Sequence, residues 1–302
     1  MSRFSEPVLG ATLAIGAYLI WGSFPLFIDA ASFASPFEVV VWRVVFGFVL
    51  AAIIVSITRS WRPIIALLRK PKSLIWVFVA AVFIYSNWQT YVFGVATGNV
   101  IETSLGYFIN PLFTVLLGVL VLREKLRPLQ WVSLSIGFVA VIVVTIDYGR
   151  LPWIAFVLAG SFGIYSLAKN KMGSNIRAIH SFTIESGMLL PFAIIQLLIV
   201  GSFVQIQFGV VGFAGTSALI AFGFMTAVPL ILFGAAASRI RLSSIGFIQY
   251  LTPVIQFSLG LFYFGEEMGP VRWAGFILVW IGLFVLTYDA FRANRMRVST
   301  AT

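Results

Sequence analysis

The second half of this chain repeats the residue pattern of its first half at a nearly constant offset. Seven residues recur with their type unchanged 142 positions later. The matching pairs are Pro111 and Pro253, Gly118 and Gly260, Glu124 and Glu266, Pro128 and Pro270, Trp131 and Trp273, Thr145 and Thr287, and Asp147 and Asp289. Prolines and tryptophans match at one offset when a unit has been duplicated. We therefore expect a first repeat over residues 1–147 and a second over residues 148–302 that ends in a short basic tail.

Long apolar runs indicate the class of protein. The chain is 60% hydrophobic and 10% charged, whereas soluble proteins carry about 25% charged residues. Runs near the ~20 residues that cross a ~30 Å hydrocarbon core recur along it. The sequence therefore predicts an all-α polytopic membrane protein with ten membrane helices. They are expected at residues 7–28, 37–57, 73–97, 100–122, 128–146, 151–168, 178–200, 212–236, 243–264 and 270–290.

The cations indicate which helix ends face the cytoplasm. With both termini inside, all but three of the 20 lysines and arginines fall in cytoplasmic segments. Arg150 and Arg272 then lie outside and Arg43 lies within a span, so the positive-inside rule predicts cytoplasmic termini. Attraction to anionic lipid explains the net charge of +10, and we expect membrane lipid but no nucleic acid as a partner. Without cysteine or a cleavable signal, the inner membrane of a bacterium is the expected location.

The two repeats are expected to enter the membrane from opposite sides, because each holds five helices and five is odd. The loop at residues 123–127 is basic, and its counterpart at residues 265–269 has no cation. This difference is expected for loops on opposite faces of the membrane. Inverted repeats related by a pseudo-two-fold axis let one chain adopt two near-equivalent states, which is the basis of alternating access.

Several segments carry a family resemblance. They are Trp21-Gly22, Asn87-Trp88 with Tyr91, and residues 102–112, 151–153, 161–165, 226–230 and 246–250. Together they resemble the RarD branch of the EamA-type transporters, within the drug/metabolite transporter (DMT) superfamily. The resemblance covers nearly the whole chain. It implies a ten-helix secondary-active transporter, an exporter of small organic metabolites or drugs.

Two prolines indicate a candidate central site. Pro111 and Pro253 fall near the middle of the fourth and ninth predicted helices. A proline inside a helix removes one hydrogen bond and displaces the carbonyl four residues earlier, here that of Tyr107 or Gln249. With Asn110 beside the first proline, two kinked helices would frame a solute site near the membrane midplane. The alternative is a kink that serves packing alone.

Polar and aromatic residues within the spans complete this predicted solute site, because a polar group in the bilayer is costly without a partner or a purpose. The candidates are Asn87, Trp88, Tyr91, Tyr107, Asn110, Thr226, Gln249 and Tyr250. Aromatic residues make up 16% of the chain, so the alternative is that these rings face lipid or helix seams. Trp88 and Tyr250 are the aromatic residues that we favour as cavity residues.

Three charged residues are candidates for ion coupling. Arg43 lies about 10 Å into the second predicted helix, so its partner should come from another helix, with Glu102 and Glu185 as candidates. The alternative is a structural ion pair or a side chain that reaches the outer surface. Glu185 has no capping role, and burial would raise its affinity for a proton. It is therefore the candidate proton carrier.

Two glutamates have a competing role as helix caps. Glu38 follows Ser35 at the spacing of a capping box, and Glu102 follows Asn99 at the same spacing. Both carboxylates would also favour the positive end of a helix dipole. We expect capping at Glu38 and leave capping and function as equal alternatives at Glu102.

The remaining residue types narrow the function classes. The chain has no phosphate-binding Gly-x-x-x-x-Gly-Lys-Ser/Thr motif. One histidine, His180, and no cysteine argue against a metal site, a cofactor and an enzyme. A membrane-embedded lipid-modifying enzyme or a non-transporting sensor or scaffold are the alternatives to transport of a small organic solute, with proton coupling open. Gly118 and Gly260 fit close packing within one bundle or between two chains, so a homodimer also stays open.

Overall fold

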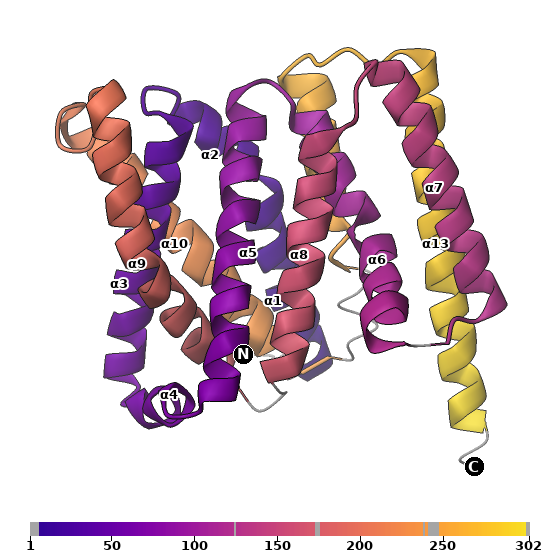
Figure 1. Ribbon diagram of the computed structural model, residues 1–302, viewed down its shortest axis with the longest axis horizontal. Coiled ribbons are helices and arrows are strands. Elements are labelled where there is room, and N and C mark those ends of the chain that lie inside the picture. Colours follow the sequence, from indigo (N-terminus) through magenta and orange to yellow (C-terminus); the bar gives the residue numbers. More distant parts are fainter. Residues whose placement is uncertain (1–5, 124, 173–175, 238, 241–247, 300–302) are drawn as a thin grey trace.

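The computed structural model describes residues 6–123, 125–172, 176–237, 239–240 and 248–299. Every regular element in these ranges is helical, and no strand occurs in them. The helices are α1 (Glu6–Gly22), α2 (Phe24–Ala30), α3 (Pro36–Ile57), α4 (Trp61–Leu68), α5 (Pro71–Ala96), α6 (Val100–Leu122), α7 (Pro128–Tyr148), α8 (Trp153–Met172), α9 (Ala178–Phe203), α10 (Gly212–Ala237), α12 (Leu251–Ser258), the π-helical η1 (Leu259–Tyr263) and α13 (Pro270–Ser299). Most of them stand side by side between two ends of the molecule, the upper and lower ends in Figure 1.

Among the described residues, eight stretches are long and apolar enough to cross a membrane. They are Glu6–Ala30, Pro36–Ile57, Ser73–Ala96, Val100–Val121, Pro128–Tyr148, Ala178–Phe203, Gly212–Ala236 and Pro270–Ala290. Trp153–Lys169 and Leu251–Tyr263 are shorter apolar helices. All of these stretches overlap the positions predicted from the sequence, and together they make the chain a polytopic helical membrane protein.

The first predicted helix is divided at Ser23 into α1 and α2. Pro25 lies in the first turn of α2 and has no N–H to donate to the carbonyl of Trp21, four residues earlier. The freed carbonyl accepts a hydrogen bond from Nε2 of Gln256 on α12, at 3.2 Å. The break therefore connects the N-terminal helix to a distant part of the chain.

The start of α3 confirms the predicted cap. The Oγ of Ser35 accepts the backbone N–H of Glu38 at 3.1 Å, and Pro36 occupies the first helical position. The carboxylate of Glu38 makes other bonds. It accepts the backbone N–H groups of Gln207 (3.0 Å) and Phe208 (2.9 Å), and so ties α3 to the loop between α9 and α10.

The short helix α4 was not predicted, because eight residues are too few for a membrane span. It lies at the lower end of the molecule and packs against α5 and α9. Ile64 and Leu67 are buried, whereas Trp61 and Leu68 are exposed. One face of this helix therefore covers the bundle.

The ninth predicted helix differs from the structure. Its first residues, 243–247, lie outside the described residues, and Gln249 and Tyr250 form a turn before α12 begins at Leu251. Pro253 is consequently in the first turn of α12, where a missing N–H removes no helical hydrogen bond. Residues 243–247, which would form the first arm of a kinked helix, lie outside the described residues, so the kink at Pro253 stays a prediction. Pro111 does lie inside α6, as expected.

Helices α7 and α13 form a closely packed pair at one side of the bundle (Figure 1). Arg127 just before α7 pairs with Asp289 of α13 at 2.5 Å, and Arg272 of α13 pairs with Asp147 of α7 at 2.7 Å. Between these ion pairs, the Oγ of Ser133 donates to the carbonyl of Gly282 at 2.6 Å. The two helices are therefore antiparallel, with one ion pair at each end.

The other packing contacts surround a central region. Helix α8 packs between α5 and α6, α3 packs against α9 and α10, and α1 packs against α10 and α12. The largest buried cluster includes Phe24 of α2, Val40 of α3, Trp88 and Tyr91 of α5, and Phe222 of α10. Side chains from α2, α3, α5 and α10 therefore converge in the middle of the bundle.

Candidate functional site

Arg43 occupies the centre of this region. It lies two turns into α3 and is 6% exposed. Its Nε donates to Oγ1 of Thr226 on α10 at 2.8 Å. Its guanidinium carbon lies 4.7 Å from the ring centroid of Phe24 on α2 and 4.4 Å from that of Trp88 on α5. Four helices therefore hold one positive charge between two aromatic rings.

These contacts leave much of the guanidinium group of Arg43 without a partner. A desolvated cation–π contact contributes about 2 kcal/mol, whereas burying an unpaired ion costs several kcal/mol. Arginine carries N–H donors on all three of its nitrogens. Among the described residues, only its Nε has an acceptor. The site therefore holds one buried positive charge, and the terminal N–H groups of Arg43 have no acceptor among the described residues.

The carboxylates expected to pair with Arg43 are engaged elsewhere. Glu102 is buried near the start of α6, and its Oε2 pairs with Arg150 at 2.7 Å. Its Oε1 accepts the backbone N–H of Ile154 at 3.0 Å, at the start of α8. The expectation that Arg43 pairs with Glu102 is therefore wrong, and Glu102 instead fixes the upper end of α8.

Capping at the start of α6 also differs from the prediction. The side chain of Asn99 makes no cap bond and donates to the carbonyl of Thr97 at 2.9 Å. The N–H groups of Val100 and Ile101 are instead bound by the carboxylate of Glu266, from the loop before α13. Burial raises the pKa of Glu266, against the opposing effect of these two hydrogen bonds and of the charge of Arg272.

Glu185 is the second carboxylate that does not reach Arg43. It is 2% exposed on α9 and forms an ion pair with Lys169 near the end of α8. Its Oε1 also accepts the hydroxyl of Ser181 at 2.5 Å, and the hydroxyl of Tyr165 lies 3.5 Å from its Oε2. Glu185 therefore belongs to a polar cluster of its own, toward the lower end of the molecule.

Aromatic and amide side chains extend the site around Arg43. The ring of Tyr91 lies 6.3 Å from that of Phe24 and 5.7 Å from that of Tyr107 on α6. Nε2 of Gln256 donates to the hydroxyl of Tyr91 at 2.9 Å. Oε1 of Gln256 is buried and has no donor within the described part of the chain.

Gln256 was not among the predicted residues, which included Gln249 instead. Gln249 is exposed in the turn before α12, whereas Gln256 is 2% exposed inside the bundle. The residue pattern favoured Gln249 because it lies four residues before Pro253, and this reasoning assumed a continuous helix. The sequence did contain a signal for Gln256 that was not used, since it is an amide side chain within a largely apolar stretch.

Asn87 connects the site to α8. Its Nδ2 donates to the carbonyl of Leu158 at 3.0 Å and to Oγ of Ser161 at 3.1 Å. The hydroxyl of Tyr107 donates to its Oδ1 at 3.4 Å. Asn87 and Tyr107 were both predicted for the solute site, and the structure places them in contact.

These contacts join Arg43 and five of the eight predicted solute-site residues to three residues that were not predicted as site residues. We call this set the Arg43 cluster: Arg43, Phe24, Asn87, Trp88, Tyr91, Tyr107, Ser161, Thr226 and Gln256. Oδ1 of Asn110, beside Pro111, is buried without a donor among the described residues. Tyr250 packs against a different group of buried residues, next to α13. No hydrogen bond or ring contact among the described residues joins the Arg43 cluster to Asn110, Gln249 or Tyr250.

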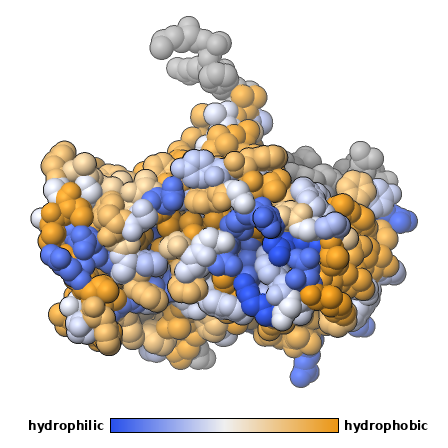
Figure 2. Space-filling model, turned by 90° about the horizontal axis from the view of Figure 1, so that it is seen from above, coloured by the Kyte–Doolittle hydropathy of each residue, from blue (hydrophilic) through white to orange (hydrophobic). Residues whose placement is uncertain are grey.

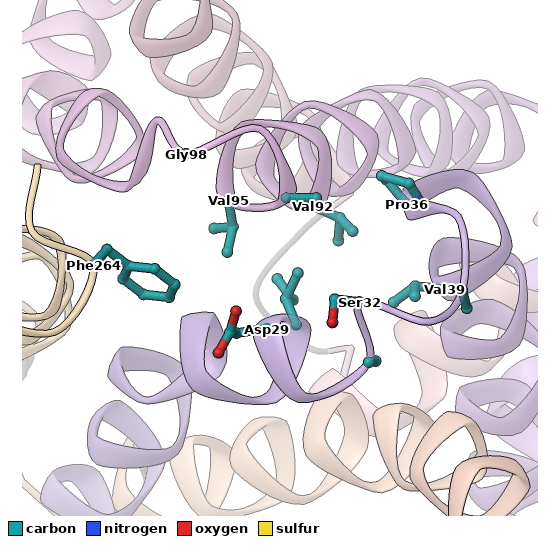
Figure 3. A pocket seen from close by; sticks show the side chains of 12 residues that line it. Asp29, Ser32, Pro36, Val39, Val92, Val95, Gly98 and Phe264 are labelled. Carbon is teal, nitrogen blue, oxygen red and sulfur yellow. The ribbon is translucent and has the colours of Figure 1, made fainter.

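A pocket of about 320 Å³ lies beside the cluster, between α2, α5 and the loop after η1. Its polar lining includes Asp29 and Ser32, and Val92, Val95 and Phe264 lie across from them (Figure 3). Ile28 of this pocket lies one helical turn after Phe24, and Val92 follows Tyr91. The pocket and the Arg43 cluster are therefore neighbours along the same two helices.

The pocket belongs to the upper end of the molecule. From that side, hydrophilic residues gather in patches on the end face, and hydrophobic residues surround the largest patch (Figure 2). The outward-facing side chains along α7 and α9 are largely apolar, including Phe138, Ile146, Ile195 and Leu198. This distribution fits polar ends in water and apolar flanks in lipid.

The chain is similar to known proteins along nearly its whole length. Residues 8–146 match the EamA-like transporter family. The chain is 42% identical to "Protein RarD" of Streptomyces exfoliatus, over 98% of this chain and 93% of that protein. It is 35% identical to "Protein RarD" of Escherichia coli K12 (95% and 96% covered) and 32% identical to "Uncharacterized transporter YojE" of Bacillus subtilis (97% and 98%).

A solved crystal structure has the same fold, with a TM-score of 0.60 at 19% sequence identity, over 93% of this chain and 98% of that one. The family and the relatives indicate a membrane transporter rather than an enzyme. The apolar spans and the relatives that match nearly the full length both support membership of this family. The recurring residue pattern is consistent with it. The chain therefore belongs to the EamA-like transporter family of the DMT superfamily, in its RarD branch.

Proposed function

We propose that this transporter is a secondary-active exporter of small organic solutes, which works by alternating access and binds its solute at the Arg43 cluster. The observation that carries the proposal is the uncompensated charge of Arg43, held between Phe24 and Trp88. Ionisable groups deep within membrane spans are expensive, and they occur where a solute or ion is handled. Donors and acceptors without partners are what a solute site needs when it is empty.

We also propose ten membrane spans, built as two inverted repeats over residues 1–147 and 148–302, with both termini in the cytoplasm. The ion pairs at the two ends of α7 and α13 support this arrangement. Asp147 and Asp289 are repeat equivalents, and each pairs with an arginine at the start of the other helix. A pseudo-two-fold axis between antiparallel helices would relate these two pairs. The start of α1 and the end of α13 also lie toward the same end of the molecule (Figure 1).

Helix α8 suggests how the two states alternate. At its upper end, the backbone N–H of Ile154 is bound by Glu102, and near its lower end Lys169 pairs with Glu185. Fifteen residues of helix separate these attachment points, a rise of about 22 Å. In our proposal, opening one attachment while the other holds would expose the Arg43 cluster to one side of the membrane at a time.

Proton coupling is assigned to Glu185 in this proposal. Protonation of Glu185 would remove the charge that holds Lys169, and this would release the lower end of α8. Glu102 and Arg43 would respond to the change rather than carry the proton, because neither contacts Glu185 among the described residues. The proposed coupling therefore concerns one ion pair, and the pH dependence of export tests it, whereas the occurrence of export tests the transport function.

The test of transport compares the organic solutes that leave cells producing the protein with those that leave cells carrying an empty vector, by mass spectrometry of the medium. We expect at least one solute to leave faster with the protein, at a rate that depends on external pH. Glu185→Gln should remove the pH dependence, and Glu267→Gln, at an exposed loop position, should retain it. If no solute leaves faster, the transport proposal is wrong; if Glu185→Gln keeps the pH profile, the coupling proposal is wrong.

The absence of cysteine makes the proposed orientation testable with single introduced thiols. Ser32 lies in the exposed loop after α2, and Thr58 lies in the exposed segment after α3. Ser32→Cys should react with a membrane-impermeant maleimide in intact cells, whereas Thr58→Cys should react only after the cells are permeabilised. The opposite pattern would reverse the proposed orientation.

A further inference from the structure

Arg43 has no carboxylate partner within the described part of the chain, and every buried carboxylate there is engaged elsewhere. Glu38 binds loop amides, Glu102 binds Arg150, Glu185 binds Lys169, Glu266 binds the start of α6, Asp147 binds Arg272 and Asp289 binds Arg127. Asp29 accepts the hydroxyl of Tyr263, Glu6 pairs with Arg239, and Glu267 is exposed in a loop. The counter-charge of Arg43 must therefore come from outside this set.

A second polar group of the cluster also lacks its partner. Oε1 of Gln256 is buried without a donor, while Nε2 of the same amide is bound to the hydroxyl of Tyr91 and to the carbonyl of Trp21. Because both Nε2 bonds fix the amide, Oε1 cannot turn away to find another donor. The cluster thus presents donors at Arg43 and a fixed acceptor at Gln256, joined through the rings of Phe24 and Tyr91.

We propose that the solute is a small organic acid whose carboxylate pairs with Arg43. The planar guanidinium group presents paired N–H donors that match the two oxygens of a carboxylate. The rings of Phe24 and Trp88 give the adjoining part of the solute apolar walls. A hydroxyl or N–H group near the carboxylate would donate to Oε1 of Gln256. This inference rests on the proposed transport function and names the class of its solute.

Charge neutralisation gives the pairing a role in transport. The empty cluster carries the charge of Arg43, whereas the loaded cluster is neutral, because the carboxylate supplies the missing negative charge. Neutral solutes of the same shape would leave the charge of Arg43 uncompensated. Selection for acids therefore follows from the chain's own electrostatics, and shape then selects among the acids.

Thermal unfolding of the purified full-length protein in detergent tests this inference with matched probes. Phenylacetate and mandelate should raise the Tm, and their neutral amides, phenylacetamide and mandelamide, should not at the same concentration and ionic strength. Mandelate should bind more tightly than phenylacetate, because its hydroxyl can donate to Gln256. Equal stabilisation by acids and amides, or no stabilisation by either acid, would overturn the proposal.

Three variants locate the effect. Arg43→Gln should weaken binding of the acids by about 30-fold or more, since removing one partner of a buried charge pair costs at least about 2 kcal/mol and about 1.4 kcal/mol is tenfold. Arg43→Lys keeps the charge and should retain weaker, acid-selective binding, so it serves if Arg43→Gln does not fold. Gln256→Leu should remove only the advantage of mandelate over phenylacetate. Unchanged acid binding in Arg43→Gln would refute the assigned site.

The export profile separates this inference from the proposed function. Solutes that leave cells with the wild-type protein but not with Arg43→Gln should be acids. If those solutes are neutral or cationic, transport stands and the solute class is wrong. If the wild-type protein exports nothing beyond the vector control, the transport function itself fails, whatever the thermal measurements give.

Discussion

Replacing Glu102 by glutamine should loosen the attachment between the start of α6 and the start of α8. The carboxylate is almost fully buried, pairs with Arg150 at 2.7 Å and accepts the N–H of Ile154 at 3.0 Å. Glutamine has nearly the same shape, so its carbonyl oxygen can still accept from Ile154. Its amide nitrogen carries only donors and would face the donors of Arg150.

The size of the effect follows from the surroundings of the two charges. A hydrogen bond to a charged group contributes about 1.5–3 kcal/mol. The side chain of Arg150 is 42% exposed, and water around it screens the pair and lowers that figure. We therefore expect a loss of about 2 kcal/mol, toward the lower part of that range. At about 2–4 °C per kcal/mol for a large domain, the Tm should fall by roughly 4–8 °C.

Thermal unfolding of the full-length protein in detergent measures this change, with Glu267→Gln as the matched control. Glu267 is exposed in the loop before α13, so losing its charge should leave the Tm almost unchanged. A Tm within about 1 °C of wild type would show that Glu102 does not hold α8 and would refute the reasoning.

Two further predictions concern other parts of the bundle. Gly275→Ala should destabilise the protein by about 1–3 kcal/mol, because a Cβ at this position would overlap Cγ2 of Val144 on α7. Gly234→Ala is the control, because its Cβ would lie 3.9 Å from Cβ of Ala178. Equal Tm values for the two variants would contradict the close contact between α7 and α13. Burial raises the pKa of Glu266 above its ordinary value of 4.5. The folded state therefore keeps this proton to higher pH than the unfolded state, so the Tm should fall as pH rises from 4.5 through the raised pKa, and Glu266→Gln should flatten that slope. A wild-type slope of the opposite sign that disappears in the variant would contradict this assignment.

Local signals in the sequence predicted local features of the fold. The serine, proline and glutamate pattern at Ser35 placed the start of α3 correctly, because a cap uses atoms only three residues apart. Apolar runs located the spans for the same reason, since hydropathy is a property of a short window. Pro25 was an available signal for the break at Ser23, but the length of the apolar run hid it. The break was therefore missed although its cause was visible.

Partners distant in the sequence could not be predicted in this way. Both glutamates considered for Arg43 are buried as expected, yet each pairs with a basic residue that had been placed in a loop or near a helix end, Arg150 or Lys169. The sequence indicates that a buried charge needs a partner, but it does not indicate which helices meet. Gln256 was missed for a related reason, because the start of α12 decides which amide faces inward.

The ion pairs of α7 and α13 also show how similar contacts can arise from residues at different positions in two helices. The aspartates lie 142 positions apart, at the offset of the recurring residue pattern, but the arginines do not, since Arg127 precedes α7 whereas Arg272 is the third residue of α13. A shift of about one helical turn still lets each guanidinium group reach its carboxylate. A cation can therefore stand at either of two positions near the start of a helix and still pair with the carboxylate. A comparison of the sequence with itself at the 142-residue offset would not align these arginines, although each one pairs with an aspartate of the other helix.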